Sequence, residues 1–282
     1  MDTPQLLNVD LHCHSCVSDG QLPPDVLARR AQGNGVDVWA LTDHDEIAGL
    51  AEAGQAAREA GMRFITGVEI SVTWAGQTVH IVGLNFDPAD AVLNEGLRAT
   101  RAGRGERAVR IGERLAALGM PGAFEGALTF AGNPELISRT HFARYLASVG
   151  HCCDVQTAFN KYLHDGGPGH EPMQWATLEQ AVSWIRGAGG RAVMAHPGRY
   201  KYTPLQFSAL FDEFIQMGGE GVEVVTGSHT VEEARQYAGE ARRYGLLASR
   251  GSDFHSEADS RIDLGMLPML PLDLTPVWHD WF

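Results

Sequence analysis

GSDFH, residues 251–255, places a carboxylate and an imidazole two positions apart, directly after the apolar run at residues 246–248. The run predicts a buried strand. If that strand extends to Asp253, the alternation of side chains along a strand puts Asp253 and His255 on one face at its carboxyl end. Such a pair can ligate one metal ion or two adjacent ones. Because the pair also occurs by chance, it indicates a metal site only if other strands supply matching ligands.

The opposite end of the chain supplies a match in VDLHCHS, residues 9–15. Strand alternation places His12 and His14 on one side and apolar side chains on the other. Burying unpaired imidazoles is costly, so the pattern indicates either an exposed edge strand or metal ligation. We favour metal ligation.

Length and composition describe a globular chain of 282 residues, of which 44% are hydrophobic and 20% charged. This length fits one large domain or a barrel with an insertion. The net charge of −13 disfavours bulk nucleic acid and anionic membranes, although bound divalent metals would reverse its sign locally. The start, MDTPQLLN, lacks the regions of a signal peptide, and no long apolar run follows. We expect a cytoplasmic protein without membrane contact.

Four cysteines lie at positions 13, 16, 152 and 153. Cys13 and Cys16 have the CxxC spacing of redox pairs and half zinc sites, but no second CxxC completes a zinc site. We expect reduced thiols with a structural role.

Strand and helix patterns alternate through most of the chain. Expected strands cover residues 36–41, 62–72, 78–86, 192–195 and 221–225, and expected helices cover residues 25–35, 47–60, 178–187, 205–217 and 231–244. Alternation of this kind predicts a mostly parallel sheet, and polar residues at successive strand exits are typical of the site of a β/α barrel. The proline-broken residues 267–282 are expected to pack as a tail.

Residues 89–169 contain no convincing strand and are expected to form helices, including one at 92–118 and another at 140–149. We interpret this stretch as a helical insertion over the active site, with the barrel formed by residues 1–88 and 170–282. The longer helix carries arginines at positions 98, 101, 104, 107 and 110. Since an α-helix has 3.6 residues per turn, the series spirals around the helix, which favours a solvated surface over a phosphate-contacting ridge.

Nitrogen and oxygen ligands recur at or near the predicted strand exits. The candidate metal ligands are His12, His14, Asp19, His44, Glu69, His80, His196, Asp253 and His255. Asp19 also suits a plain Asp-Gly turn, and the local sequence does not separate the two roles. Glu69 is the one charge among apolar and hydroxyl neighbours, where an acid is rarely unpaired. The set exceeds the four to six ligands of one transition-metal ion, so we expect two or three ions.

Four residues are candidates for contact with a phosphate. Arg139 and His141 lie at the start of a predicted helix, where donors favour anions, and the local sequence does not decide whether they make this contact. Arg199 follows the strand that ends at His196, and His229 follows the strand GVEVV. Arg199 and His229 are also the candidate catalytic residues, with His229 or a metal-bound water as proton donor to the leaving group.

The motifs DLHCHS (10–15), TDHD (42–45), GVEI (67–70), AHPG (195–198) and GSDFH (251–255) resemble, in order, those of the polymerase and histidinol phosphatase (PHP) family. The resemblance implies a distorted (β/α)7 TIM-like barrel with up to three metals, and all nine ligand positions of that family carry suitable residues here. Mn²⁺ is then the expected ion, with Zn, Fe or Mg as alternatives. Position 19 carries Asp, as in the polymerase-associated members, and not the His of the histidinol phosphatase branch, so the resemblance argues against histidinol phosphate as the substrate.

The helical segment after HIVGLNF (80–86), SRTHFARYL (138–146) and AHPGRY (195–200) resemble a branch of stand-alone PHP phosphoesterases that act on nucleoside 3′,5′-bisphosphates. The implied activity removes the 3′-phosphate from a molecule such as 3′-phosphoadenosine 5′-phosphate, by attack of a hydroxide held between two ions. Related proteins degrade RNA from its 5′ end, so a 5′–3′ exoribonuclease acting on short RNA is the alternative. We infer a small nucleotide substrate and no obligate protein partner.

Two further alternatives rank lower. A metal-dependent amidohydrolase would share the barrel, but no Lys suited to a carbamylated bridge stands at a strand exit. A non-catalytic, metal-stabilised interaction module would tolerate gaps in the ligand set, and the sequence shows none. ATP use, serine hydrolysis and dinucleotide binding have no support, because the chain has no Walker loop, GxSxG elbow or Rossmann fingerprint.

Overall fold

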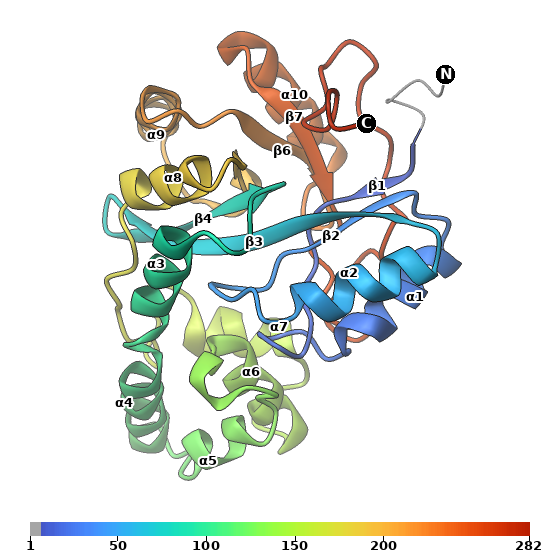
Figure 1. The fold of residues 1–282 in the computed structure, drawn as a ribbon. Coiled ribbons are helices and arrows are strands. Elements are labelled where there is room, and N and C mark those ends of the chain that lie inside the picture. The colour runs from blue at the N-terminus through green and yellow to red at the C-terminus, as the bar shows by residue number, and fades with distance from the viewer. Residues whose placement is uncertain (1–6) are drawn as a thin grey trace.

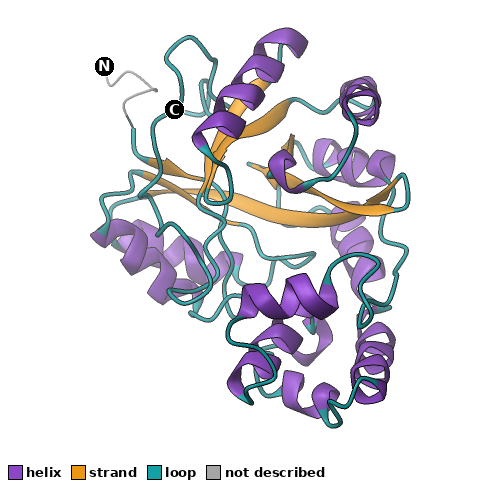
Figure 2. Ribbon diagram, turned by 180° about the vertical axis from the view of Figure 1, so that it is seen from behind, coloured by secondary structure: helices purple, strands orange, loops and turns teal. Residues whose placement is uncertain are grey.

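Seven strands form one curved sheet with helices outside it (Figures 1 and 2). The computed structural model describes residues 7–282, so most of the stretch that argues against a signal peptide lies outside the described residues. The strands follow each other around the sheet in chain order: β1 (Val9–Asp10), β2 (Val38–Leu41), β3 (Arg63–Trp74), β4 (Gln77–Leu84), β5 (Arg191–Met194), β6 (Gly221–Thr226) and β7 (Leu247–Gly251).

The first and last strands bring the sheet close to a full barrel. The Leu11 amide donates to the Arg250 carbonyl at 3.1 Å, and the His14 amide donates to the Phe254 carbonyl at 2.9 Å. The bonds join the end of β1 and the residues after it to β7 and the residues after that strand. The two motifs from opposite ends of the chain therefore lie side by side.

Neighbouring strands run parallel except at β4, which is antiparallel to both β3 and β5. The reversal arises because β3 and β4 form a hairpin, whose turn residues Ala75 and Gly76 have φ of 47° and 76°. Two positive φ angles in succession suit the twist of a tight hairpin. The predicted distorted seven-stranded α/β barrel is confirmed, and β4 is its distortion.

Helices connect the other strands of the barrel. They are α1 (Pro24–Gly33), α2 (Leu50–Glu59), α8 (Leu178–Gly187), the 3₁₀ turn η3 (Pro197–Arg199), α9 (Pro204–Gln216) and α10 (Val231–Tyr244). The predicted helices at 178–187 and 231–244 are confirmed residue for residue. Each starts at a capping box, in which Thr177 pairs with Gln180 and Thr230 with Glu233, so the sequence marks their first turns clearly.

The first and last strands are shorter than predicted, ending at Asp10 and Gly251. Asp253 has a φ of 54°, in the left-handed region that is incompatible with an extended strand. The prediction that strand alternation sets Asp253 and His255 on one face is therefore wrong. The segment that follows β7, not the strand itself, presents these two side chains.

The segment between β4 and α8 is helical, and most of it lies together below the sheet in Figure 1. Its elements are α3 (Ala91–Arg101), α4 (Arg104–Ala117), α5 (Ala123–Leu128), the 3₁₀ turn η1 (Pro134–Leu136), α6 (Arg139–Ser148), α7 (Val155–Ala158) and the π-helix η2 (Phe159–Leu163). The single helix predicted at 92–118 is wrong, because the chain breaks at Ala102 and Gly103. Glycine weakens a helix, and this break lets α3 and α4 pack on different partners.

Two separate apolar cores reflect those partners. Leu93 and Leu97 of α3 belong to the barrel core. Ile111 of α4 and Phe142 of α6 belong to a smaller core inside the helical segment. The predicted division of the chain stays a prediction: a barrel of residues 1–88 and 170–282, and an insertion of residues 89–169. Helix α3 lies within the predicted insertion but packs on the barrel core.

The arginine series is not uniformly solvated. Arg104 and Arg107 are each only 5% exposed, and their guanidinium carbons lie 4.7 and 5.2 Å from the centre of the Trp175 ring. Arg104 also forms an ion pair with Asp45, which follows β2. The expected solvated surface is wrong for these two residues, because the Trp175 segment covers this side of α4.

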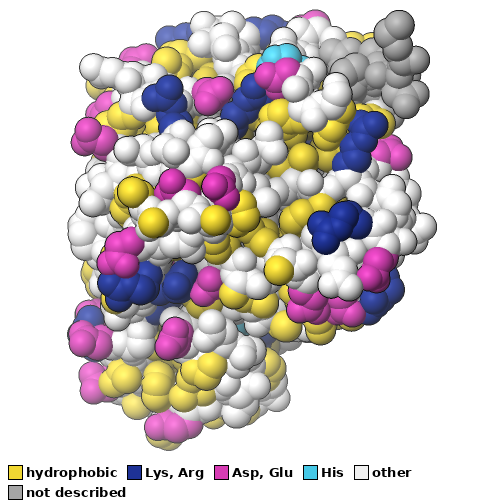
Figure 3. All heavy atoms as spheres, in the orientation of Figure 1, with side chains coloured by type: hydrophobic (Ala, Val, Ile, Leu, Met, Phe, Trp, Pro, Cys, Tyr) yellow, Lys and Arg dark blue, Asp and Glu magenta, His cyan; other side chains and the backbone are white. Residues whose placement is uncertain are grey.

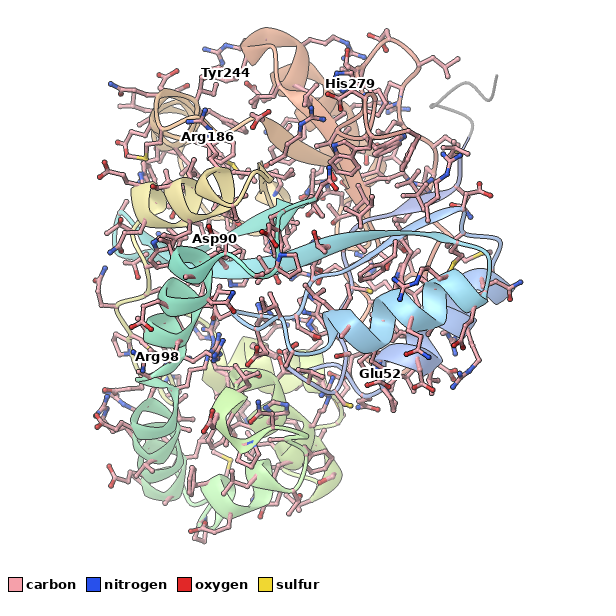
Figure 4. All side chains as sticks on the ribbon, viewed as in Figure 1. Glu52, Asp90, Arg98, Arg186, Tyr244 and His279 are labelled. Carbon is pink, nitrogen blue, oxygen red and sulfur yellow. The ribbon has the colours of Figure 1, made fainter. Side chains whose placement is uncertain are left out.

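The surface carries mixed charges, with basic and acidic side chains interspersed over the face in Figure 3. Figure 4 shows Asp90 and Arg98 near opposite ends of α3. Asp90 caps that helix by accepting from the Leu93 amide at 2.8 Å, and Arg98 forms an ion pair with Glu95 on the protein surface.

All four cysteines are free thiols. No helix within residues 7–282 is long and apolar enough to cross a membrane.

Removing one partner of the buried ion pair between Arg104 and Asp45 should destabilise the protein, because the other charge would stay buried without a partner. Asp45→Ala leaves the Arg104 guanidinium buried without its carboxylate, so we expect the free energy of unfolding to fall by about 3–5 kcal/mol. Urea unfolding of metal-free protein measures the change. Glu95→Ala, which breaks only an exposed pair, is the control and should leave the midpoint unchanged. Equal midpoints for both variants would contradict the prediction.

Candidate metal centre

The structure brings all nine candidate ligands together. Their ligand atoms form four overlapping groups, and within each group the atoms lie within 4.8 Å of one another. The groups are His14, Asp19, His44 and His255; His12, His14 and Asp253; His12, Glu69 and His196; and His44, Glu69 and His80. Four residues occur in two groups each, so ions placed in neighbouring groups would share ligands.

Glu69 on β3 lies at the centre of the cluster. Its Oε1 is 2.8 Å from His196 Nε2 and 2.9 Å from His80 Nδ1. Its Oε2 is 3.1–3.3 Å from nitrogens of three more imidazoles, those of His12, His14 and His44. A carboxylate that faces imidazoles with both oxygens is suited to bridge two ions.

Two aspartates complete the cluster on either side. Asp253 Oδ1 lies 3.2 Å from His14 Nε2, while its other oxygen pairs with Arg199. Asp19 Oδ1 lies 3.3 Å from His255 Nε2 and 3.8 Å from His44 Nε2. The turn that carries Asp19 therefore supplies a possible ligand, and the sequence alone could not distinguish this from a plain turn role.

Buried polar atoms without a hydrogen-bond partner concentrate in this cluster. Six predicted ligands contribute at least one such atom each, including His14 Nδ1, Asp19 Oδ1, His44 Nδ1, Glu69 Oε2, His196 Nδ1 and Asp253 Oδ1. Buried polar groups in proteins are normally paired. Imidazole nitrogens and carboxylate oxygens that face one another without protein donors fit a set of divalent ions.

The electrostatics of the cluster favour ionised carboxylates. Burial raises the pKa of Glu69, but the imidazoles of His80 and His44 outweigh it and hold that pKa well below its usual value. Burial also opposes the charge of Asp253, and the Arg199 guanidinium reverses the effect and holds its pKa well below the usual range. Both side chains therefore stay negative, as metal ligands must.

The pKa values of two of these imidazoles shift in opposite directions. Burial, assisted by Arg199, lowers the pKa of His196 to about 4, so this ring keeps a free lone pair at neutral pH. Burial opposes the charge of His14 too, but its hydrogen bonds to Asp253 and Glu69 raise its pKa to about 10. An ion that binds His14 must displace that proton, so metal binding releases protons here.

Left-handed backbone recurs after three of the strands that lead into the cluster. Asp45, His196 and Asp253 have φ of 51°, 26° and 54° and follow β2, β5 and β7. Non-glycine residues seldom adopt this region, which costs about 1–3 kcal/mol each. The surroundings compensate, for example through the His196 amide, which donates to Glu223 Oε2 at 2.6 Å.

A cleft of about 1020 Å³ opens beside the cluster. Asp253 and His255 of the candidate ligands line it, and so do Arg139 and Arg199. Arg199 is about half exposed, while Arg139 is held by Asp165 at 2.5 Å. The structure thus places two of the four predicted phosphate contacts on the cleft.

The other two predicted phosphate contacts do not line the cleft. His141 is fully buried and accepts from the Ser138 amide at 2.9 Å in the capping box of α6. His229 donates to the Val224 carbonyl at 3.0 Å, accepts from the Gly198 amide at 3.1 Å and stacks on Tyr237. These contacts favour structural roles, so catalysis by His229 and phosphate contact by either residue stay predictions.

Comparison with known proteins agrees with this geometry. A family model described as PHP domain matches residues 10–201. The chain belongs to the PHP domain family. The predicted resemblance is confirmed, and the cluster of imidazoles and carboxylates stands where its motifs meet.

Curated relatives of this PHP-domain protein extend over almost its whole length. The 3′,5′-nucleoside bisphosphate phosphatase of Chromobacterium violaceum is 48% identical, over 98% of this chain and 96% of the relative. The 5′-3′ exoribonuclease Rnm of Escherichia coli K12 is 39% identical, over 99% of this chain and 96% of the relative.

Solved structures show the same fold. A Chromobacterium violaceum protein described as an amidohydrolase, with bound sulfate and no metal, superimposes with a TM-score of 0.94 at 48% identity, covering 97% of this chain and 95% of that one. A provisionally assigned metal-dependent phosphoesterase of Bifidobacterium adolescentis superimposes with a TM-score of 0.82 at 28% identity, covering 99% of this chain and 95% of that one.

One buried acid behind the cluster of this PHP-domain protein, Glu223, is not among the residues predicted from the sequence. Glu223 on β6 accepts from His12 Nδ1 at 2.8 Å and from the His196 amide at 2.6 Å. The first bond fixes the His12 ring so that its Nε2 faces Glu69. An acid inside the apolar strand GVEVV is the same signal that identified Glu69, and it could have found Glu223 as well.

Two further acids of the TDHD motif hold the loops that carry ligands. Asp43 accepts from the Ser15 amide at 2.7 Å and from the Ser15 and Ser18 hydroxyls, both at 2.6 Å. Asp45 accepts from the Ser71 amide at 2.7 Å. No single-residue signal marks these roles, because they depend on loops that meet only in the folded chain.

Glu223→Gln should weaken metal binding. The amide has one acceptor oxygen where the carboxylate has two, so either His12 or the strained turn at His196 loses its partner. We expect the affinity for Mn²⁺ to fall by about 10–100-fold, measured by competition with a chelating dye. Glu220→Gln, beside it but on the surface with Arg191, is the control. Unchanged affinity in the Glu223 variant would contradict the assignment.

His141 should make the metal-free protein sensitive to acid. Burial lowers its pKa from 6.5 to about 4, so the unfolded chain takes up a proton that the folded chain refuses. The contribution of neutral His141 to the free energy of unfolding is fully present above pH 6.5 and is lost as the pH falls toward 4.

His141→Gln removes this titration, and Gln can still complete a capping box. Between pH 7 and pH 5 the wild type should lose about 2 kcal/mol more of its free energy of unfolding than the variant. Urea unfolding at both pH values in the presence of a chelator measures the difference. Parallel losses would show that His141 does not titrate as its burial implies.

Proposed function

We propose that this protein is a metal-dependent phosphatase. It removes the 3′-phosphate from nucleoside 3′,5′-bisphosphates, such as 3′-phosphoadenosine 5′-phosphate, and releases a 5′-nucleotide and phosphate. The observation that carries the proposal is the convergence of nine candidate ligands beside a cleft lined by arginines. The name of the relative that is 48% identical over nearly the full chain supports the choice of substrate.

Two or three divalent ions held by these nine residues would activate a water molecule at neutral pH and offset the charge of the phosphate oxygens. Mn²⁺ is the proposed ion, with Zn, Fe or Mg as alternatives, since a set of imidazoles and carboxylates suits such ions better than Ca. The proposed ligands are His12, His14, Asp19, His44, Glu69, His80, His196, Asp253 and His255.

The chain's own residues bind and orient the substrate. Arg199 projects into the cleft beside Asp253, where its planar guanidinium can hold two oxygens of the 3′-phosphate. Arg139 lies on the same cleft, fixed by Asp165 and by the Leu163 carbonyl at 3.0 Å, and would bind the second phosphate. Sulfate in the structure of the Chromobacterium violaceum relative fits an anion-binding fold.

A 5′–3′ exoribonuclease acting on short RNA is the second candidate, and the size of the cleft favours it. At about 1020 Å³ the cleft reaches the upper end of the range for small-molecule sites, which leaves room beyond one nucleotide. Its basic residues are Arg139, Arg199, Lys201 and Arg261. The relative from Escherichia coli carries this activity in its name.

Two other functions fit the structure less well. A carbamylated lysine bridge, as a metal-dependent amidohydrolase would need, has no candidate at a strand end, because the two lysines of the sequence lie elsewhere: Lys161 in η2 of the helical segment and Lys201 in the loop between η3 and α9. A non-catalytic module would not need the complete ligand set or the arginines of the cleft. A cytoplasmic location and the lack of an obligate protein partner stay predictions.

The function is tested by metal analysis of the purified protein together with phosphate release from mono- and bisphosphorylated nucleotides. A phosphatase should release phosphate from 3′,5′-bisphosphates at a far higher kcat/KM than from 5′-monophosphates, and chelation should abolish the reaction. A ladder of 5′-phosphorylated RNAs separates the second candidate, which should prefer chains of several nucleotides. Turnover of neither substrate class by metal-loaded protein would refute both.

Removing single ligands should stop turnover. Asp253→Ala or His44→Ala should lower kcat at least about 100-fold, because each takes a ligand from the ions that activate water. Phosphate release from the bisphosphate measures the effect. The matched controls are Asp273→Ala, which breaks only an exposed pair with Arg242, and His279→Ala near the C-terminus (Figure 4). Wild-type rates in both ligand variants would show that the proposed ligands are not needed for turnover.

A further inference from the structure

Asp19 is the candidate ligand whose position depends most on the helical segment. It lies in the turn between β1 and α1, and only 3% of it is exposed. That turn folds tightly back on the chain before it, since a Cβ on Gly20 would lie 2.1 Å from the His14 carbonyl oxygen. No strand holds the Asp19 side chain, so its direction is set by the residues packed against it.

The two carboxylate oxygens of Asp19 have separate partners. Oδ1 faces the imidazoles of the cluster, the nearest being His255 Nε2 at 3.3 Å. Oδ2 accepts from the Thr140 hydroxyl at 3.0 Å and from the Ser138 hydroxyl at 3.1 Å. With both donors on one oxygen, rotation of the carboxylate is fixed and the other oxygen stays turned toward the cluster.

A third contact from α6 holds the backbone of the same residue. Arg144 is 4% exposed and donates to the Asp19 carbonyl at 2.7 Å, while its Nε donates to Asp259 at 2.8 Å. The first two turns of α6 thus grip both the main chain and the side chain of Asp19. Ser138 also caps α6, accepting from the Thr140 amide at 3.2 Å, so the hydroxyl donors and the helix start are one unit.

We propose that Ser138 and Thr140 are positioning residues for Asp19, and that they set the affinity of one ion position, the group of His14, Asp19, His44 and His255. The inference rests on the metal ligands proposed above. Asp19 belongs to that group alone, whereas Glu69 joins two others. Loss of the hydroxyls should therefore affect one ion and leave the rest in place.

Thr140→Val tests this most cleanly, because it keeps the shape of the side chain and removes only the hydroxyl. We expect the affinity for one Mn²⁺ per chain to fall by about 10-fold or more, while the remaining ions bind as in the wild type. Equilibrium dialysis against a series of free Mn²⁺ concentrations, followed by metal analysis, resolves the individual ions. Thr140→Ser should restore the lost ion, since it restores the donor.

Ser148→Ala is the matched control. Its hydroxyl lies on the same helix but bonds only to the Tyr145 carbonyl at 2.8 Å, so its removal should change no binding step. Thermal unfolding of the metal-free variants checks the fold, and the midpoint of Thr140→Val should match that of the wild type.

Three results overturn the inference: an unchanged binding curve for Thr140→Val, an equal weakening of every ion, or failure of Thr140→Ser to restore binding. A wild-type protein that binds no divalent ion instead refutes the proposed ligand set, and the inference with it. The first three results leave the proposed phosphatase standing, so the two failures are distinguishable.

Discussion

A buried polar atom needs a partner, and the interior of this barrel contains an unusual concentration of such atoms. Moving a charged carboxylate or imidazole out of water costs on the order of several kcal/mol of free energy, unless opposite charges or hydrogen bonds replace the solvent. Glu69 illustrates the demand, because five imidazoles face its two oxygens. The rest of the structure arranges strands, turns and helices so that these groups compensate one another and leave lone pairs for cations.

The support comes from two directions. From the barrel, Glu223 on a neighbouring strand fixes one imidazole and a strained turn with its two oxygens. From the helical segment, Thr140 orients Asp19 and Arg104 neutralises Asp45. The helical segment therefore does more than border the cleft, because its side chains hold the loops that carry ligands.

The nine candidate ligands that the structure brings together were recognisable in the sequence, since a His, Asp or Glu that follows or interrupts an apolar strand is conspicuous. Helices with capping boxes, such as the one that begins after Thr230, were equally clear. Features that depend on distant parts of the chain were not predicted. The left-handed turn at Asp253 ends a strand that local pattern would extend. The burial of Arg104 depends on Trp175, which lies seventy-one positions further along the chain. The spacing of the arginines gives no information about a contact with so distant a residue.

The pairing of the β1 and β7 ends of the sheet has a consequence for folding during synthesis of the chain. Residues of the first motif need those of the last, which are synthesised some 240 residues later, to close the sheet and complete the cluster. A growing polypeptide on the ribosome thus holds only part of the ligand set until its final stretch emerges. Premature termination before β7 would remove both the strand that closes the sheet and the candidate ligands Asp253 and His255, so incomplete copies would lack part of the proposed metal centre.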